Sequence, residues 1–206
     1  MRYGFVVDTQ RCIGCHTCSV ACRTENNLPE GVWWNRTLTQ GGDEMDTPSG
    51  EFPNVEMSYY TVACQHCAKP ACVDVCPVGA TWKDEETGIV RQDYTKCIGC
   101  KMCIAACPYE GVRHYNDGEP TWALDFAMGD PEVPAHQANV VEKCTMCEHR
   151  VARDEEPMCV KVCPTRARFW GDFDDPESEV SKLIAEREYK QLLPEKGTEP
   201  NVYYLV

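Results

Sequence analysis

Residues 11–22 read RCIGCHTCSVAC, and residues 96–107 read KCIGCKMCIAAC; seven of the twelve positions are identical. A second pair of segments repeats in the same way, because PACVDVCPVGATW (70–82) matches PMCVKVCPTRARF (157–169) at seven of thirteen positions. The two repeats are offset by 85 and 87 residues. The chain therefore has the order A-B-A-B, and a duplication of this long period decides the fold.

All sixteen cysteines fall into four groups, with none left over. This complete use indicates that all sixteen are ligands. Group one is Cys12, Cys15, Cys18 and Cys22; group two is Cys64, Cys67, Cys72 and Cys76; group three is Cys97, Cys100, Cys103 and Cys107; group four is Cys144, Cys147, Cys159 and Cys163.

Groups one and three have the spacing C-x2-C-x2-C-x3-C, which is typical of bacterial ferredoxins. Three thiolates from a tight loop hold one iron–sulfur cubane, and the fourth, on the next helix, reaches a different cluster. Gly14 and Gly99 suit such a loop because glycine adopts positive φ and allows close backbone approach. Groups two and four are stretched versions without the glycine, and the insert 148–158 of group four is polar.

Two other uses of cysteine compete with this interpretation. Zinc is also held by paired CxxC elements in tetrahedral sites, but zinc ribbons usually separate two CxxC pairs by a longer span. Eight structural disulfides are disfavoured, because no secretory leader or Arg-Arg pair precedes the first cysteine and the cysteines then start in a reducing compartment. The spacing favours iron–sulfur clusters.

The gaps between groups suggest which motifs pair. The shortest gap, 20 residues (77–96), links groups two and three into a compact unit, so groups one and four pair around it. Spacing alone also allows one with two and three with four. Crossed ligation in the nested arrangement gives four sets: Cys12, Cys15, Cys18 and Cys163; Cys22, Cys144, Cys147 and Cys159; Cys64, Cys67, Cys72 and Cys107; Cys76, Cys97, Cys100 and Cys103.

The order of the four groups, with RCIGCHTC first and a CxxC-x11-CVKVCP element late, resembles the electron-transfer subunits of DMSO reductase, polysulfide reductase and related molybdopterin enzymes. The resemblance covers roughly residues 1–175. It implies the nested pairing and four [4Fe–4S] clusters, since group three keeps all its cysteines. It also implies that the cluster of Cys12, Cys15, Cys18 and Cys163 faces a molybdopterin catalytic subunit, while that of Cys76, Cys97, Cys100 and Cys103 faces the electron donor, often a quinol-oxidising membrane subunit.

The expected fold is α+β, with two nested dicluster ferredoxin modules. The outer module comprises 1–30 and 138–175, and the inner one 57–116; 31–56 and 117–137 are loop-rich insertions, and 176–206 forms a C-terminal helix and docking tail. Asp175 is the expected N-cap, with Pro176 in the first helical position. Residues 201–206 are expected to form a short strand or a docking arm.

Composition narrows the function. The formal charge of −13 disfavours binding to nucleic acid, and no phosphate-binding, zincin or nucleophile motif indicates an active site. We therefore expect a non-catalytic electron-transfer subunit in anaerobic respiration, with a hydrogenase or formate hydrogenlyase relay and a zinc-stabilised interaction module as alternatives. No apolar run is long enough to cross a membrane, so a soluble subunit is expected, cytoplasmic as made or periplasmic by co-export.

His16, His66 and His149 lie within cysteine groups, but four thiolates already fill each site, so they are expected beside the clusters or at the surface. Basic residues also flank the groups. A cation near cluster sulfur raises the reduction potential, although ordinary charge balance is the simpler interpretation of any single one. These basic residues are Lys101, Arg113, Lys143, Arg166 and Arg168.

Overall fold

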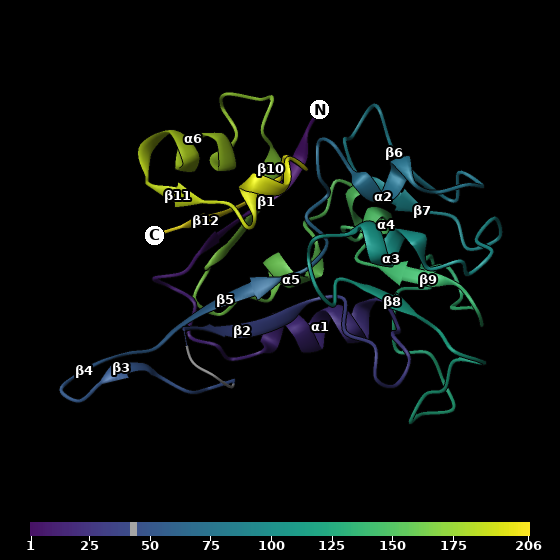
Figure 1. Ribbon diagram of the computed structural model, residues 1–206, viewed down its shortest axis with the longest axis horizontal. Helices are drawn as coiled ribbons and strands as arrows, with labels where there is room; N and C mark the ends of the chain where they lie inside the picture. The colour runs from purple at the N-terminus through teal and green to yellow at the C-terminus, as the bar shows by residue number, and fades with distance from the viewer. Residues whose placement is uncertain (42–44) are drawn as a thin grey trace.

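The computed structural model describes residues 1–41 and 45–206. The chain mixes short helices with small β-sheets, in agreement with the expected α+β class. Figure 1 shows the largest sheet at upper left and the shorter hairpins and helices of the middle of the chain at right. The division into nested modules with the boundaries given above stays a prediction.

The largest sheet joins the two ends of the chain. It contains β1 (Tyr3–Asp8), β10 (Arg168–Asp172), β11 (Tyr189–Lys190) and β12 (Val202–Leu205), in the order β10-β1-β12-β11. β1 pairs antiparallel with β10 and parallel with β12 (Figure 1). The first strand therefore lies between two strands that follow it by more than 150 residues in the sequence.

The middle of β1, Phe5 to Val7, is apolar because both faces of the strand are buried. Phe5 and Val7 lie on one face and pack with Cys18 and Cys159, so this face looks toward the cysteine groups. Val6 lies on the other face and packs with residues of α6 (Glu179–Glu186). Alternating burial on two sides explains a continuous hydrophobic run in so short a strand.

The structure corrects the start of the C-terminal helix. Asp175 is not the N-cap: α6 begins at Glu179, and the Ser178 hydroxyl accepts a hydrogen bond from the Ser181 N–H. Asp175 instead accepts from the Glu177 N–H in the preceding turn. Of the two interpretations of residues 201–206, the strand is correct, since β12 is an interior strand of the sheet.

Four two-stranded antiparallel sheets complete the β structure: β2 (Arg36–Gln40) with β5 (Ser58–Val62), β3 (Ser49–Glu51) with β4 (Asn54–Glu56), β6 (Thr81–Lys83) with β7 (Val90–Gln92), and β8 (Arg113–Tyr115) with β9 (Val141–Lys143). β3 and β4 project from the body at lower left in Figure 1. The segment 31–56 thus contains strands, whereas 117–137 contains neither helix nor strand.

Apart from α6, the α-helices are short, and each lies next to cysteines. They are α1 (Thr17–Glu25), α2 (Ala71–Asp74), α3 (Met102–Ala106), α4 (Glu148–Val151) and α5 (Met158–Lys161); a 3-10 turn, η1, spans Pro194–Lys196. α1 packs against α5, and α2 packs against α3. Groups one and four therefore share one helix pair, and groups two and three share the other.

Cysteines form part of the interior itself. Trp34, which is 1% exposed, packs in a cluster that contains Cys22, Cys64 and Cys144. The aliphatic residues around them are few, as expected for a chain whose interior is organised by its cysteines. In the described part of the chain, no helix is long and apolar enough to span a bilayer.

Candidate iron–sulfur cluster sites

The four cysteine loops share one backbone turn. In each CxxC element the residue before the second cysteine has positive φ: Gly14 at 67°, His66 at 42°, Gly99 at 66° and Met146 at 60°. This confirms the loop expected around Gly14 and Gly99. It also shows that groups two and four adopt the same turn without glycine, which sequence reasoning did not find because positive φ in His or Met leaves no sequence signal.

The first predicted set contains thiols from both ends of the chain. Burial raises the pKa of the Cys12 thiol, and the nearby thiols of Cys18 and Cys163 raise it further. The loop also carries Cys15, which is exposed and contacts the Thr17 hydroxyl at 3.3 Å. Hydrogen bonding with Thr17 lowers the pKa of Cys15. A cluster held here would lie near the molecular surface.

The second predicted set is the most deeply buried. Burial raises the pKa of Cys22 well above its ordinary value, and so do three neighbouring thiols, those of Cys144, Cys147 and Cys159. The Asn26 amide lies 3.7 Å from the sulfur of Cys22 and 3.9 Å from that of Cys147. The last cysteine of group one therefore lies with the first three of group four, the crossing that ferredoxin ligation requires.

The third predicted set is also brought together. Burial raises the pKa of Cys67 to about 12, and the thiols of Cys64, Cys72 and Cys107 add to this. Burial likewise raises the pKa of Cys107 to about 11, again with Cys64 and Cys72 as neighbours. Here the last cysteine of group three lies with the first three of group two.

The fourth predicted set is the most open. Burial raises the pKa of Cys103, and the Cys97 thiol adds to this. Cys100 is exposed. Cys76 is half-buried. Burial acts to raise the pKa of its thiol, but the backbone N–H groups of residues 78–81 outweigh burial and lower that pKa. These N–H groups form a cradle suited to an anion.

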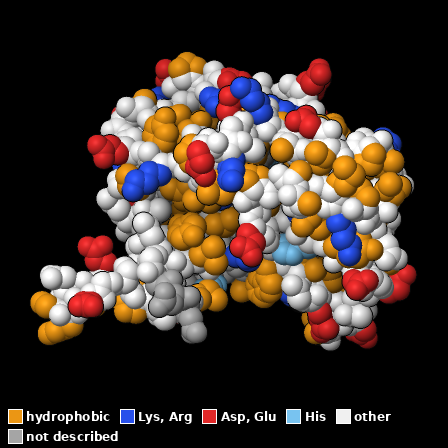
Figure 2. Space-filling view, in the orientation of Figure 1, with side chains coloured by type: hydrophobic (Ala, Val, Ile, Leu, Met, Phe, Trp, Pro, Cys, Tyr) orange, Lys and Arg blue, Asp and Glu red, His pale blue; other side chains and the backbone are white. Residues whose placement is uncertain are grey.

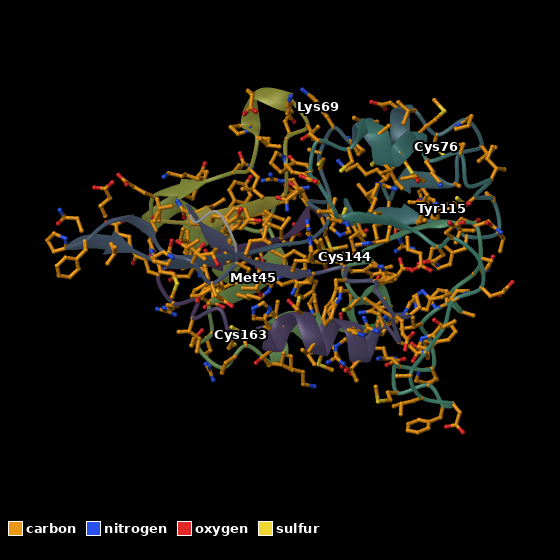
Figure 3. The ribbon with its side chains drawn as sticks, turned by 60° about the horizontal axis from the view of Figure 1, so that its bottom comes forward. Met45, Lys69, Cys76, Tyr115, Cys144 and Cys163 are labelled. Atoms are coloured by element: carbon orange, nitrogen blue, oxygen red, sulfur yellow. The ribbon has the colours of Figure 1, made fainter. Side chains whose placement is uncertain are left out.

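Thiols of successive sets also neighbour one another. Burial is the main cause that raises the pKa of the Cys159, Cys144 and Cys103 thiols. A thiol of the neighbouring set raises each pKa further: Cys18 acts on Cys159, Cys64 on Cys144, and Cys72 on Cys103. In Figure 3 the labelled Cys163, Cys144 and Cys76 run in this order across the molecule, with Cys144 in the middle. The sets therefore form a row rather than a compact square.

Buried polar atoms around the row fit cluster ligation. In the described residues, Arg113 Nη2, Arg168 Nε and His66 Nε2 are buried without a hydrogen-bond partner. His66 Nδ1 accepts from the Val90 N–H, so its proton is on Nε2. A buried donor without an acceptor is strongly unfavourable, and cluster sulfurs are negatively charged acceptors. These atoms therefore match the electrostatic demands of iron–sulfur clusters.

Two family models match the chain. A "4Fe-4S dicluster domain" model matches residues 55–123 and 132–173, more than half of the chain, and a "4Fe-4S binding domain" model matches residues 9–25. Both describe iron–sulfur sites, which supports that interpretation of the cysteines over zinc. The chain is a ferredoxin-type electron carrier with four [4Fe–4S] clusters.

Relatives specify the class further. The chain is 52% identical to a putative iron–sulfur subunit of dimethyl sulfoxide reductase from Halobacterium salinarum, over 99% of this chain and 79% of that one. It is 38% identical to the arsenate respiratory reductase iron–sulfur subunit of a Shewanella species, over 100% and 96% of the two chains. It is also 41% identical to a selenate reductase subunit of Mesobacillus selenatarsenatis, over 100% and 72%.

The chain belongs to the iron–sulfur electron-transfer subunits of the molybdopterin oxidoreductase family. It is a non-catalytic subunit of a reductase complex, as expected from the cysteine pattern. The names of the relatives support the reductase interpretation and not the hydrogenase alternative.

Proposed function

We propose that the chain relays single electrons along four clusters held in two nested pairs. The neighbouring thiols of Cys22 and Cys147 carry this proposal, because they join the last cysteine of group one to group four. The ligand sets, in order along the relay, are Cys12, Cys15, Cys18 and Cys163; Cys22, Cys144, Cys147 and Cys159; Cys64, Cys67, Cys72 and Cys107; and Cys76, Cys97, Cys100 and Cys103.

The two ends of the row are the proposed entry and exit points. Cys15 and Cys100 are exposed, whereas every cysteine of the second set is buried. The loops beside these ends expose Ile13 and Ile98, which are 60% and 63% exposed. Exposed apolar side chains around a cluster are suited to docking a partner close enough for electron transfer.

The catalytic subunit is proposed to dock at the Cys15 end. Tyr59, in β5, lies against the Gly14 loop, and the β3–β4 hairpin precedes β5 and projects beyond this end. Figure 2 shows hydrophobic side chains at the hairpin tip, where Phe52 is 91% exposed. An exposed apolar tip is a suitable anchor for a partner subunit.

Electrons are proposed to enter at the Cys100 end from a donor, such as a quinol-oxidising membrane subunit, and to leave toward a molybdopterin catalytic subunit. This direction rests on the reductase names of the relatives. The compartment would follow the catalytic partner, since the relay is proposed to travel with it, folded, if the complex is exported.

The cluster content is tested by counting iron in the anaerobically purified complex. Four cubanes require about sixteen irons per chain. Cys103→Ser should remove or convert one cluster and leave the signals of the other three. Ala105→Ser is the matched control, because it places a hydroxymethyl group on an exposed position of the same helix and should change nothing.

The nested ligation is tested by comparing which electron paramagnetic resonance signal each substitution alters. Cys22→Ser and Cys147→Ser should alter the same signal, and Cys15→Ser a different one. If Cys22→Ser and Cys15→Ser altered the same signal, the crossed ligand sets would be wrong.

A further inference from the structure

Buried cations without carboxylate partners accompany the cysteine sets. Among the described residues, four Lys or Arg side chains are buried: Arg113, Lys143, Arg150 and Arg168. Arg150 has ordinary partners, Glu25 at 3.1 Å and Glu155 at 2.6 Å. The other three form no ion pair with a carboxylate in the part of the chain described. Since an uncompensated buried charge is strongly unfavourable, their counter-charge must come from another group.

Arg113 and Lys143 lie directly opposite each other in the β8–β9 ladder. Opposed residues of antiparallel strands have Cβ atoms about 4.5–5.5 Å apart, and like charges at such positions destabilise a sheet. Their protein partners are neutral: Lys143 Nζ donates to the carbonyls of Val90 and, at 2.9 Å, of Cys144, while Arg113 Nη1 lies 3.4 Å from Gln92 Oε1. The pair therefore requires an anion that the side-chain carboxylates do not supply.

The groups around this pair are cysteines. Burial acts to lower the pKa of Arg113, but the neighbouring thiols outweigh it and raise that pKa. These thiols belong to Cys72, Cys64 and Cys103. Burial raises the pKa of Cys72 and Cys144, and the Lys143 ammonium opposes the rise in both. Arg113 thus adjoins the third and fourth sets, and Lys143 adjoins the second and third.

Arg168 occupies the corresponding place between the first and second sets. It begins β10, is 6% exposed, and its Nη2 lies 3.5 Å from the Cys159 sulfur. Its Nη1 donates to the Thr61 hydroxyl. Burial acts to lower the pKa of Arg168, but the thiols of Cys159 and Cys18 outweigh it and raise that pKa.

We propose that Arg168, Lys143 and Arg113 are fixed counter-charges, one at each junction between consecutive clusters, that raise the reduction potentials of the two clusters they separate. This inference rests on the ligand sets of the proposed function. A cation stabilises the reduced cluster, which carries the extra electron, and one placed between two clusters stabilises both. Lys101 and Arg166, which also flank the groups, are exposed and lack this role.

The test is a potentiometric titration of the intact complex, followed by electron paramagnetic resonance. Arg113→Gln should lower the potentials of the third and fourth clusters, Lys143→Gln those of the second and third, and Arg168→Gln those of the first and second. We expect about a tenfold change in the oxidised-to-reduced ratio at fixed potential, which for one electron is about 59 mV. Lys101→Gln and Arg166→Gln are the matched exposed controls and should shift nothing comparable.

Charge-retaining variants separate charge from packing. Arg113→Lys, Arg168→Lys and Lys143→Arg should keep potentials near those of the wild type. Where a glutamine variant fails to load iron, Arg→Met or Lys→Met replaces it, because methionine fills a similar space without adding a buried polar group. If all charge-free variants at one position lose clusters while the charge-retaining variant loads them, the counter-charge is required there, and the shift in potential is decided at the other two positions.

Four intact clusters with unchanged potentials in the charge-free variants would overturn the inference and leave the proposed function intact. Equal shifts in the charge-retaining and charge-free variants would also overturn it. Failure of the proposed function is distinguishable, because it shows in the serine substitutions of Cys22, Cys147 and Cys15, whatever the cation variants do.

Discussion

Two glycines with the same backbone angle differ in what surrounds them. Gly99, in the third cysteine loop, has φ of 66°, and an added Cβ would lie 2.4 Å from the carbonyl oxygen of Asn139. Gly197, which belongs to no cysteine loop, has φ of 68°, and an added Cβ would meet nothing within 4 Å. Both substitutions carry the strain of left-handed backbone, but only one forces a collision.

Gly99→Ala should therefore weaken retention of the fourth cluster much more than Gly197→Ala. Left-handed backbone costs a non-glycine residue about 1–2 kcal/mol in both variants, and the clash adds to this only at Gly99. The measurement is the bleaching rate of the visible cluster absorption in the presence of an iron chelator. Equal rates in the two variants would show that close approach to Asn139 does not matter.

The sequence predicts which cysteines are ligands because cluster chemistry restricts cysteine spacing directly, and these ligand sets stay a prediction. The sequence did not show that Lys143 is buried and Lys101 is not, since a buried and an exposed lysine beside a cysteine have the same local sequence. In the structure Lys143 is fully buried, whereas Lys101 lies over the ring of Tyr115 at 3.7 Å. Burial depends on which strands pair, and β8–β9 joins segments more than twenty-five residues apart.

At the level of elements, α6 has a well-defined beginning that the sequence did not reveal. Asp175 and Ser178 are both suitable N-caps, and Pro176 favours a start at the earlier one. The structure uses Ser178, because its hydroxyl also donates to the carbonyl of Asp172 at 2.6 Å and so fixes the helix to β10. A tertiary contact decides between two equally good local signals.

Ser178→Ala should destabilise the protein by about 1 kcal/mol, the usual effect of losing an N-cap. Asp175→Ala is the control, since it removes only a hydrogen bond within a turn, and it should have the smaller effect. The midpoint of thermal unfolding, followed by circular dichroism at one scan rate, compares them. A larger effect of Asp175→Ala would place the functional cap at the residue favoured by the sequence.

For the whole molecule, the sequence left the pairing of cysteine groups open, because loop lengths restrict topology only weakly. The structure brings α1 to α5 and α2 to α3. The C-terminal strand was predictable as a strand but not as an interior one, since its neighbour β1 lies almost two hundred residues away. Parallel pairing between the ends of a chain leaves no local pattern in the sequence.

Deletion of residues 200–206 should therefore impair cluster retention, although no cysteine is removed. Leu205 is fully buried, and Asn201 donates to the carbonyl of His66 at 2.8 Å, which ties the tail to the second cysteine loop. Iron per chain and resistance to limited proteolysis should both fall. Deletion of Val206 alone, which is 38% exposed, is the control. Unchanged iron content in the longer deletion would show that the sheet does not support the clusters.

The position of β1 between β10 and β12 also bears on how the protein is made. While the ribosome is still adding the middle of the chain, β1 has neither of its neighbours, and Cys22 waits for thiols that are translated more than a hundred residues later. The hairpins of the middle segment can close first. The cysteines of group one therefore lack their partner thiols until residues 144–163 have been translated, so the outer sites are completed after the inner ones, whose last cysteine is Cys107.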